Sequence, residues 1–403
     1  MKRGESKMGK VRNVAVVGAG ITKFGRREAS WKDMVQEAGK SVMKDVPKLD
    51  KSEIDSLFVG ACMPERWAYQ GQPAAVAAEL LGLCPTRVIA RTEQACASGQ
   101  AAIRYAWLSI AAGVSDIAMV VGAEKMCLED MNESNMTMMS VGDREFESAI
   151  GFTAPGFFGM VMARHTHLYG TTKDQYAAVS IKNHGFSVTN PYAQFTKPLT
   201  REAYDNSAMI SAPVCLFDCS GMTDGAAAII LASEERAKEL TDSPMWILGG
   251  AQCVLAANTM NQMGELTDWR ALKRAGEEAY KMAGITAKDV DVAEVHDCFT
   301  VSEIIEYEEL GFCKKGEGGR FIQEGRSGLD GDVAVNTSGG LLSCGHPLGA
   351  TSVRQAWEVF NQLRGTVPKE RQRKNCEIGL THNLSGMAQV HSIMIYGKSP
   401  KRG

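Results

Sequence analysis

The sequence predicts an α/β protein built from two similar halves, and two observations lead to that prediction. Short apolar runs of strand type alternate with helical patterns along most of the 403 residues. Three short segments also recur later in the chain in the same order, which is the signature of an internal repeat. The length fits two to three domains of about 150 residues each.

The repeat relates equivalent places in the two halves at offsets between 236 and 250 residues. The matched segments are Trp31–Val35 with Trp269–Lys273, Lys51–Asp55 with Ala287–Asp291, and Ile103–Trp107 with Val353–Trp357. At the same offsets Cys96 corresponds to His346, and Cys62 to Cys298. A pseudo-twofold arrangement of the halves would bring these turns to a shared centre, at the carboxyl ends of strands where α/β sheets place ligands.

Each element follows from a local pattern. The predicted strands are 14–18, 57–60, 117–122, 226–231 and 246–249, and the predicted helices are 31–46 and 99–112. The first strand is followed by glycines, but Lys23 stands where a dinucleotide fingerprint needs its third glycine, so that kind of site is excluded.

Residues 126–220 differ in composition, with many Met, Asn, Tyr, Thr and Gly residues and little periodicity, and we interpret them as a long insertion. The predicted organisation is an N-terminal half over 1–125 that is completed by 221–245. An inserted loop domain spans 126–220, and a C-terminal half spans 246–403.

Composition excludes several classes of function. The formal net charge is −3, so no excess of basic residues indicates binding to nucleic acid or to an anionic membrane. No apolar run reaches the 18 residues that a membrane span needs. The first ten residues lack the apolar core of a secretory signal, so we expect a cytoplasmic protein. The eleven cysteines are expected to be thiols, and without a C-x-x-C pair no metal site is predicted.

Cys96 is the first candidate for chemistry. It lies between a strand and a helix whose first turn carries small residues, Ala97-Ser-Gly99. A helix N-terminus has unpaired N–H groups and a partial positive charge, which favours a thiolate. The alternative is an ordinary buried cysteine at a helix start.

His346 lies in a glycine-dense segment, Ser338–Ala350, and is followed by Pro347. It could accept the Cys96 proton and then donate to a developing oxyanion, or it could be a loop histidine with a backbone contact. His296 and Cys298 follow another apolar strand, and a second thiol there could move a proton to and from carbon. Both could instead be structural.

Gly386 is expected at the end of the last core strand, in a turn whose N–H could complete an oxyanion hole with that of Cys96. The alternative is a plain glycine turn. The Met-rich segment 126–139 favours packing or a subunit contact, with a wall for an acyl chain as the alternative.

With these motifs assembled, the chain resembles a thiolase of the sterol-carrier-protein type over nearly its whole length. The motifs are Val16–Gly25, Ala95–Gly99, Asn190–Ala193, Asp224–Ala228, His296–Phe299 and Gly345–Ala350. The resemblance implies a five-layered α-β-α-β-α fold with a loop domain that holds coenzyme A, which would be a substrate or product rather than a covalently bound cofactor.

The resemblance also implies a role for each candidate. Cys96 matches the acylated nucleophile, and His346 matches the histidine that activates it. Cys298 matches the acid/base cysteine, His296 an oxyanion donor beside it, and Gly386 the backbone donor of the second oxyanion hole. Leu384-Ser-Gly386 replaces the C-x-G motif of classical thiolases, so the acid/base thiol cannot come from that loop. Thr351-Ser352 also departs from the usual Thr-Gly.

The implied activity is reversible cleavage or condensation of a β-ketoacyl-CoA. Formation of acetoacetyl-CoA and cleavage of a larger or aromatic substrate are both open. A non-catalytic thiolase-like scaffold or acyl-CoA-binding subunit is the alternative from another class. The resemblance further implies a homodimer or tetramer, and a small zinc-ribbon/OB-fold companion protein could assist coenzyme A binding unless the loop domain binds it unaided.

Overall fold

The computed structural model describes residues 11–254 and 264–400, and its centre is a ten-stranded mixed sheet. The strands are β1 (Val14–Ile21), β2 (Ser56–Gly60), β3 (Val88–Thr92), β4 (Ile117–Glu124), β7 (Gly225–Ser233), β8 (Met245–Val254), β9 (Val292–Glu294), β10 (Ala334–Val335), β11 (Ile378–Ser385) and β12 (Val390–Gly397). Their order across the sheet is β10-β9-β11-β12-β8-β1-β7-β4-β2-β3.

The strand order repeats in the two halves of the sheet. Counted along the chain, the order in each half is third, second, fourth, fifth, first, and the fifth strand (β7 or β12) is antiparallel to both of its neighbours. The halves join where β1 pairs with β8, Ala15 opposite Trp246 and Val16 opposite Met245. The predicted duplication is therefore present in the topology, while the residue boundaries of the halves stay a prediction.

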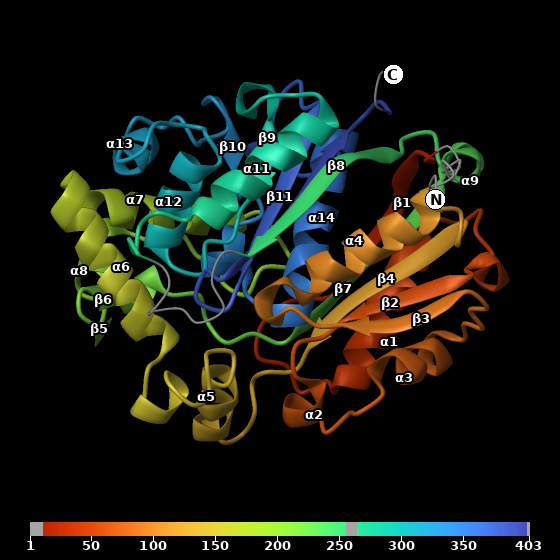
Figure 1. Ribbon diagram of the computed structural model, residues 1–403, viewed down its shortest axis with the longest axis horizontal. Coiled ribbons are helices and arrows are strands. Elements are labelled where there is room, and N and C mark those ends of the chain that lie inside the picture. The colour runs from red at the N-terminus through yellow and green to blue at the C-terminus, as the bar shows by residue number, and fades with distance from the viewer. Residues whose placement is uncertain (1–10, 255–263, 401–403) are drawn as a thin grey trace, which may run out of the picture.

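Helices cover the sheet in layers. The main ones are α1 (Trp31–Asp45), α3 (Pro73–Leu81), α4 (Ser98–Ala111), α11 (Arg270–Ala283), α12 (Thr300–Glu309) and α14 (Leu348–Arg364). Helices α4 and α14 contact each other and strands of both halves, whereas α1 and α3 pack on the first half and α11 packs on the second (Figure 1). This is the predicted five-layered α-β-α-β-α arrangement.

Alternating strand residues fill the two kinds of layer. Val14 and Val16 belong to the apolar cluster around α4 and α14, and Ala15 and Val17 belong to the cluster under the outer helices. Both faces of β1 are therefore buried, which explains why its sequence is a continuous apolar run rather than an alternating one.

The segment between β4 and β7 adds no strand to the ten-stranded sheet, as expected for an insertion. It contains α5 (Met131–Met139), α6 (Ala154–Tyr169), α7 (Lys173–Ser187), α8 (Arg201–Asp205) and a separate two-stranded sheet of β5 (Met209–Ser211) and β6 (Val214–Cys215). The other α-helices in the described part of the chain are α2 (Pro64–Trp67), α9 (Glu234–Leu240) and α13 (Gly318–Gln323).

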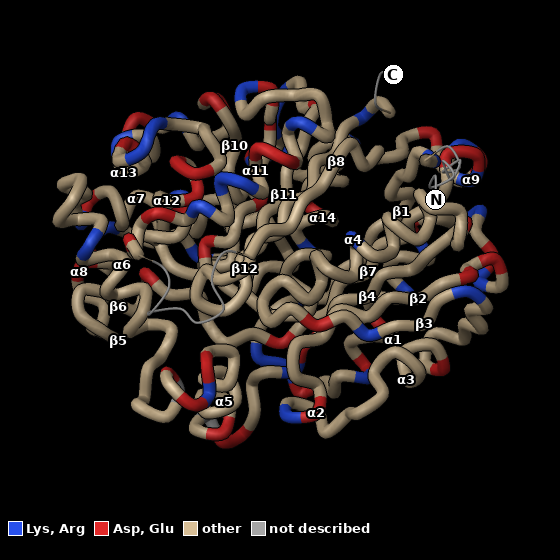
Figure 2. Tube along the Cα trace, viewed as in Figure 1, with Lys and Arg blue, Asp and Glu red and all other residues tan. Residues whose placement is uncertain are grey.

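Charged residues of both signs are interspersed around the periphery (Figure 2). None of the helices in the described part of the chain has the length and apolar character needed to cross a membrane.

One sequence expectation is wrong. Gly386 does not follow the last core strand, because β12 comes after it and pairs with β11 along its whole length. Gly386 and Ala388 adopt left-handed backbone angles, with φ of 60° and 64°. These angles reverse the chain, so the residues after the turn form an antiparallel hairpin rather than leaving the sheet.

Glycines set how closely the central helices approach the strand ends. A methyl group on Gly122 would lie 2.2 Å from the carbonyl oxygen of Gly349, and one on Gly349 would lie 2.4 Å from that of Gly60. Glu124, fully buried at the end of β4, also accepts the N–H groups of Cys62 (2.8 Å) and Gly349 (2.9 Å). The start of α14 is thereby fixed against both β2 and β4.

This packing predicts that Gly122→Ala lowers the free energy of unfolding by about 1–3 kcal/mol, because the added carbon meets rigid backbone. Gly185→Ala is the matched control: it is an exposed helical position where a methyl group meets nothing within 4 Å, and the change should be neutral or stabilising by up to about 1 kcal/mol. Urea unfolding of both variants measures this. Equal stability of the two variants would show that β4 and α14 are not in tight contact at Gly122.

Candidate active site

Cys96 lies where β3 passes into α4, in a single turn of 3-10 helix, Ala95–Ala97. Ala95 has a φ of 44°, an unusual conformation for a residue with a side chain. Ser98 holds this turn, accepting the N–H of Gln94 (2.9 Å) and donating to the carbonyl of Ala95 (2.6 Å). The strained turn fixes the direction of the Cys96 side chain.

Burial decides the protonation of Cys96. It raises the pKa of the thiol to about 12, although the N–H groups of Gly386 and of Cys96 itself point to the sulfur and oppose the rise. The backbone N–H groups favour the thiolate, as the sequence predicts, but burial outweighs them, so the position at a helix start does not suffice for a thiolate at neutral pH. The resting thiol needs a base.

His346 supplies a nitrogen with a free lone pair. The hydroxyl of Thr351 donates to the carbonyl of Pro347 (2.9 Å), so its oxygen accepts the proton on Nδ1 of His346 (2.7 Å). The other nitrogen, Nε2, is then unprotonated in the neutral ring. Burial holds the pKa of His346 well below its ordinary value, so the ring is neutral. Thr351, which sequence reasoning left uninterpreted, thus selects the tautomer of His346.

His296 is held in the same tautomer by a longer series of hydrogen bonds. Gln355 donates to the carbonyls of Val295 (3.0 Å) and His382 (3.3 Å), which leaves its side-chain oxygen as an acceptor for Asn383. The oxygen of Asn383 then accepts the proton on Nδ1 of His296 (3.0 Å). Burial lowers the pKa of His296 to about 3. Its Nε2 is buried and has no hydrogen-bond partner among the described residues.

The structure brings all five predicted residues together. The sulfur of Cys96 and one ring nitrogen each of His296 and His346 lie within 4.8 Å of one another, and the two rings are nearly perpendicular, with centroids 4.8 Å apart. Cys298 is close enough that negative charge on Cys96 raises its pKa, after the larger effect of burial. Its sulfur lies 3.7 Å from the hydroxyl of Ser302.

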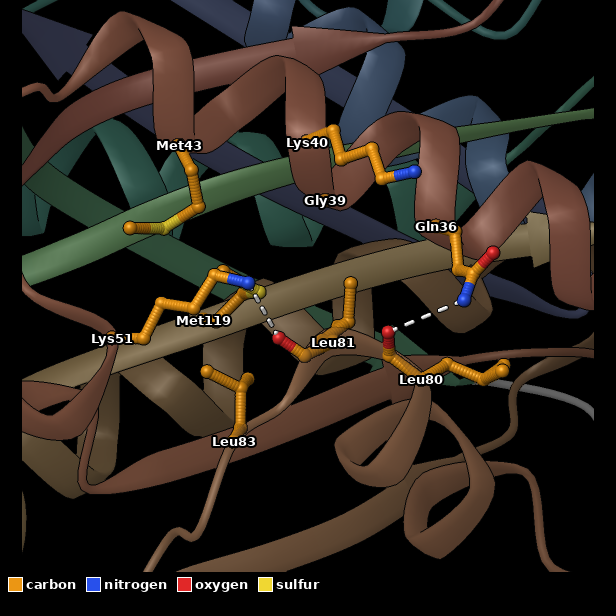
Figure 3. A pocket seen from close by; sticks show the side chains of 9 residues that line it. All are labelled: Gln36, Gly39, Lys40, Met43, Lys51, Leu80, Leu81, Leu83 and Met119. Atoms are coloured by element: carbon orange, nitrogen blue, oxygen red, sulfur yellow. Dashed lines mark hydrogen bonds between the residues drawn. The ribbon is translucent and has the colours of Figure 1, made fainter.

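Of the other residues that the sequence analysis singled out, some lie at the site and some do not. Met126 belongs to the apolar cluster that contains Cys96, and Met138 packs against that cluster, whereas Met136 is exposed. Cys344 belongs to the central core instead, with its sulfur 3.7 Å from Asn190. A separate cavity of about 30 Å³ between α1 and α3 is lined by aliphatic and polar side chains, of which Lys51 and Gln36 donate to the helix-end carbonyls of Leu81 and Leu80 (Figure 3). It contains none of the predicted site residues.

Comparisons with known proteins agree with this geometry. The model for "Thiolase, N-terminal domain" matches residues 14–205, and that for "Thiolase C-terminal domain-like" matches residues 254–398. An acetyl-CoA acetyltransferase of Methanothermobacter thermautotrophicus is 40% identical over 96% of this chain and 100% of its own length. The chain belongs to the thiolase family.

Two more comparisons extend this result. The benzoylsuccinyl-CoA thiolase subunit BbsB of Thauera aromatica is 30% identical over 93% of this thiolase and 95% of its own length. The solved structure of the Ltp2-ChsH2(DUF35) aldolase has a TM-score of 0.82 at 24% identity, covering 98% of this chain and 99% of that one. The latter likeness shows the fold alone. The acetyltransferase relatives establish an acyltransferase of the thiolase type, with the acyl substrate open.

Sequence reasoning missed a row of three buried polar side chains behind the site of this thiolase. His391 donates from Nε2 to the carbonyl of Ala388 (3.2 Å), so its Nδ1 accepts from Nε2 of His382 (3.0 Å). The remaining nitrogen of His382 has a lone pair and lies 3.5 Å from a carboxyl oxygen of Glu306. All three side chains are fully buried. No spacing signal could have found them, because they come from α12, β11 and β12.

These two atoms of His382 and Glu306 form no hydrogen bond in the structure, and only a protonated Glu306 has a proton to direct at the lone pair of His382. Burial raises the pKa of Glu306 well above its ordinary value, and the charges of Asp297 and Glu303 raise it further. Glu306 is thus a neutral acid close to Cys298, whose pKa its charge would otherwise raise.

This assignment predicts different effects for two substitutions of Glu306. Glu306→Gln should fold within about 1 kcal/mol of the parent, because an amide has the same shape and also has a proton to direct at His382. Glu306→Ala should lose about 2 kcal/mol or more, from the unpaired imidazole nitrogen and the cavity. Equal losses of stability in the two variants would contradict the assignment of Glu306 as a neutral carboxylic acid.

The same assignment fixes a pH dependence. A carboxyl with a raised folded-state pKa stabilises most below its unfolded pKa, and that stabilisation is lost as pH rises towards the folded value. The parent should therefore lose stability relative to Glu306→Gln as pH increases above about 4.3. Urea unfolding across pH 4–8 measures this difference.

Proposed function

We propose that the chain transfers an acyl group between Cys96 and coenzyme A, with His346, His296 and Cys298 moving the protons. The observation that carries the proposal is the cluster of one thiol and two neutral imidazoles within 4.8 Å, beside a second thiol. The enzyme would cleave or form a β-ketoacyl-CoA by this route.

The first step would be acylation of Cys96. Nε2 of His346 takes the proton of the Cys96 thiol, and the thiolate attacks the thioester carbonyl. The N–H groups of Cys96 and Gly386 then hold the oxyanion, and each such donor contributes about 10²–10³ in rate. Cys298 gives its proton to the departing coenzyme A sulfur.

The second step would use the thiolate left on Cys298. In condensation it removes a proton from the carbon next to the carbonyl of a second acyl-CoA, and that carbon attacks the acyl group on Cys96. The carbon–sulfur bond of Cys96 then breaks, and its thiolate takes back the proton held by the imidazoles. Thiolysis is the reverse. Because Nδ1 of His296 is committed to Asn383, its Nε2 donates to an oxyanion only in the protonated ring. We therefore propose that the two imidazoles share the proton taken from Cys96.

The acyl group would be chosen by the side chains next to Cys96. Met126 and Met138, next to Cys96, would form an adaptable wall for the acyl chain. Relatives named for acetyl-CoA and for benzoylsuccinyl-CoA leave both a small and an aromatic acyl group open. A non-catalytic scaffold stays the alternative, although such a role gives no reason for two thiols and two histidines to meet in one buried cluster.

The test is acylation of Cys96 followed by turnover. After mixing with acetyl-CoA, acetoacetyl-CoA and an aromatic β-ketoacyl-CoA, intact-mass measurement should detect an acyl adduct, and digestion should place it on the peptide that contains Cys96. Cys298→Ala should still form the adduct, because coenzyme A can leave as the thiolate, but it should lose turnover by about 10²-fold or more, since no group remains to take the proton from carbon.

Cys344→Ala is the control, because it removes a buried thiol that lies outside the cluster. It should keep both the adduct and turnover. An adduct on Cys298 or Cys344 with Cys96 unmodified would refute the assignment. A complete absence of adduct and turnover with every ester would favour the scaffold.

We further propose a cytoplasmic homodimer or tetramer that works with a small zinc-ribbon/OB-fold companion. The companion is supported by the likeness to a solved thiolase-fold protein named together with a DUF35 protein, and by a relative named as a subunit. The purified chain should then be oligomeric by light scattering yet weakly active in thiolysis until a companion is added. Full activity of the chain alone would exclude the requirement, and a monodisperse monomer would exclude the oligomer.

A further inference from the structure

The Cys96 cluster has the composition and arrangement of a site for a soft divalent metal ion. We propose that Cys96, His296 and His346 bind Zn²⁺, and that the bound ion inhibits acyl transfer by occupying the nucleophile. The binding itself does not depend on the proposed function, although the inhibition does. The sequence predicted no metal site, because these residues are 200 and 50 positions apart and form no recognisable spacing.

Both imidazoles present the correct nitrogen. Metal-binding histidines use a neutral ring whose other nitrogen donates to an oxygen acceptor, which fixes the tautomer and the ring orientation. Here Nδ1 of His346 donates to Thr351, and Nδ1 of His296 donates to Asn383. The two Nε2 lone pairs are therefore available without any change of tautomer, and that of His296 is buried with no partner in the described part of the chain.

The distances suit a tetrahedral ion after a small adjustment. Zn²⁺ binds nitrogen at about 2.0–2.1 Å and sulfur at about 2.3 Å, so tetrahedral ligand atoms lie roughly 3.3–3.6 Å apart. The three atoms now lie within 4.8 Å of one another. Side-chain rotations can close this difference. Three protein ligands would leave a fourth position for water.

The donor set and the local charges define the class of ion. One thiolate and two imidazoles favour Zn²⁺ or Co²⁺ over Mg²⁺ or Ca²⁺, which prefer oxygen. The carboxyl group of Glu93 acts on Cys96 as a negative charge and would attract a cation, and Glu124, whose pKa burial raises to about 7, would add to this when ionised. On binding, the S–H bond of Cys96 breaks, a sulfur–metal bond forms, and one proton leaves to solvent, with no change of oxidation state.

Titration of the purified chain with Co²⁺ tests the site without reference to turnover. We expect one equivalent to bind with a thiolate-to-cobalt absorption band, and Zn²⁺ to displace it. Cys96→Ser should abolish the band, and prior alkylation of Cys96 should do the same. Cys84→Ser, which removes an exposed thiol, is the matched control and should keep the band. Asn383→Leu should weaken binding by about 10–100-fold through loss of the acceptor behind His296.

Absence of the band in the parent, or its persistence in Cys96→Ser, would overturn the proposal. In an active preparation, one equivalent of Zn²⁺ should also stop acyl transfer, and a chelator should restore it. A cobalt band in a chain that never forms an acyl adduct would support the metal site and refute the proposed function, so the two can fail separately.

Discussion

The tight contact between the central helices and the strand ends is the constraint on which the site depends. Gly60, Gly122 and Gly349 let backbone meet backbone, and Glu124 fixes the start of α14 with two hydrogen bonds. This contact holds the beginning of α14 beside that of α4. Since Cys96 precedes α4 and His346 precedes α14, the residues of two sequence halves meet as a direct consequence of how the layers pack.

Burial of this meeting point controls its charges. The thiols of Cys96 and Cys298 are driven towards the protonated form, and the imidazoles of His296 and His346 towards the neutral form. Any chemistry here therefore begins from neutral partners and proceeds by transferring a proton, rather than from a preformed ion pair. The fixed tautomers provide the acceptors for that transfer, and the same lone pairs are what a soft metal ion requires.

Sequence patterns found the fold and the residues with distinctive neighbours. Continuous apolar runs and the repeat revealed the two halves, and local motifs revealed Cys96, His346 and Cys298. The groups behind them escaped detection for a physical reason: Gln355 and Glu306 are polar residues on helices, and one sequence does not distinguish a buried one from a solvated one. The helix-start effect on the Cys96 thiol was predictable because it is local, whereas the larger opposing effect of desolvation depends on the whole packed structure.

The inserted segment is joined by hydrogen bonds to the loops that form the site. Asn183 of α7 donates to Asp297 and to Glu303 (2.8 Å each), and Asp297 in turn accepts the N–H groups of Leu341 and Leu342 in the glycine-dense loop that leads to His346. Asn190 donates to the carbonyl of Ser338 (2.8 Å) in the same loop. The insertion is therefore hydrogen-bonded to both of the loops that carry the site histidines. Because Asp297 adjoins His296, the geometry of the imidazole pair depends on the position of the insertion.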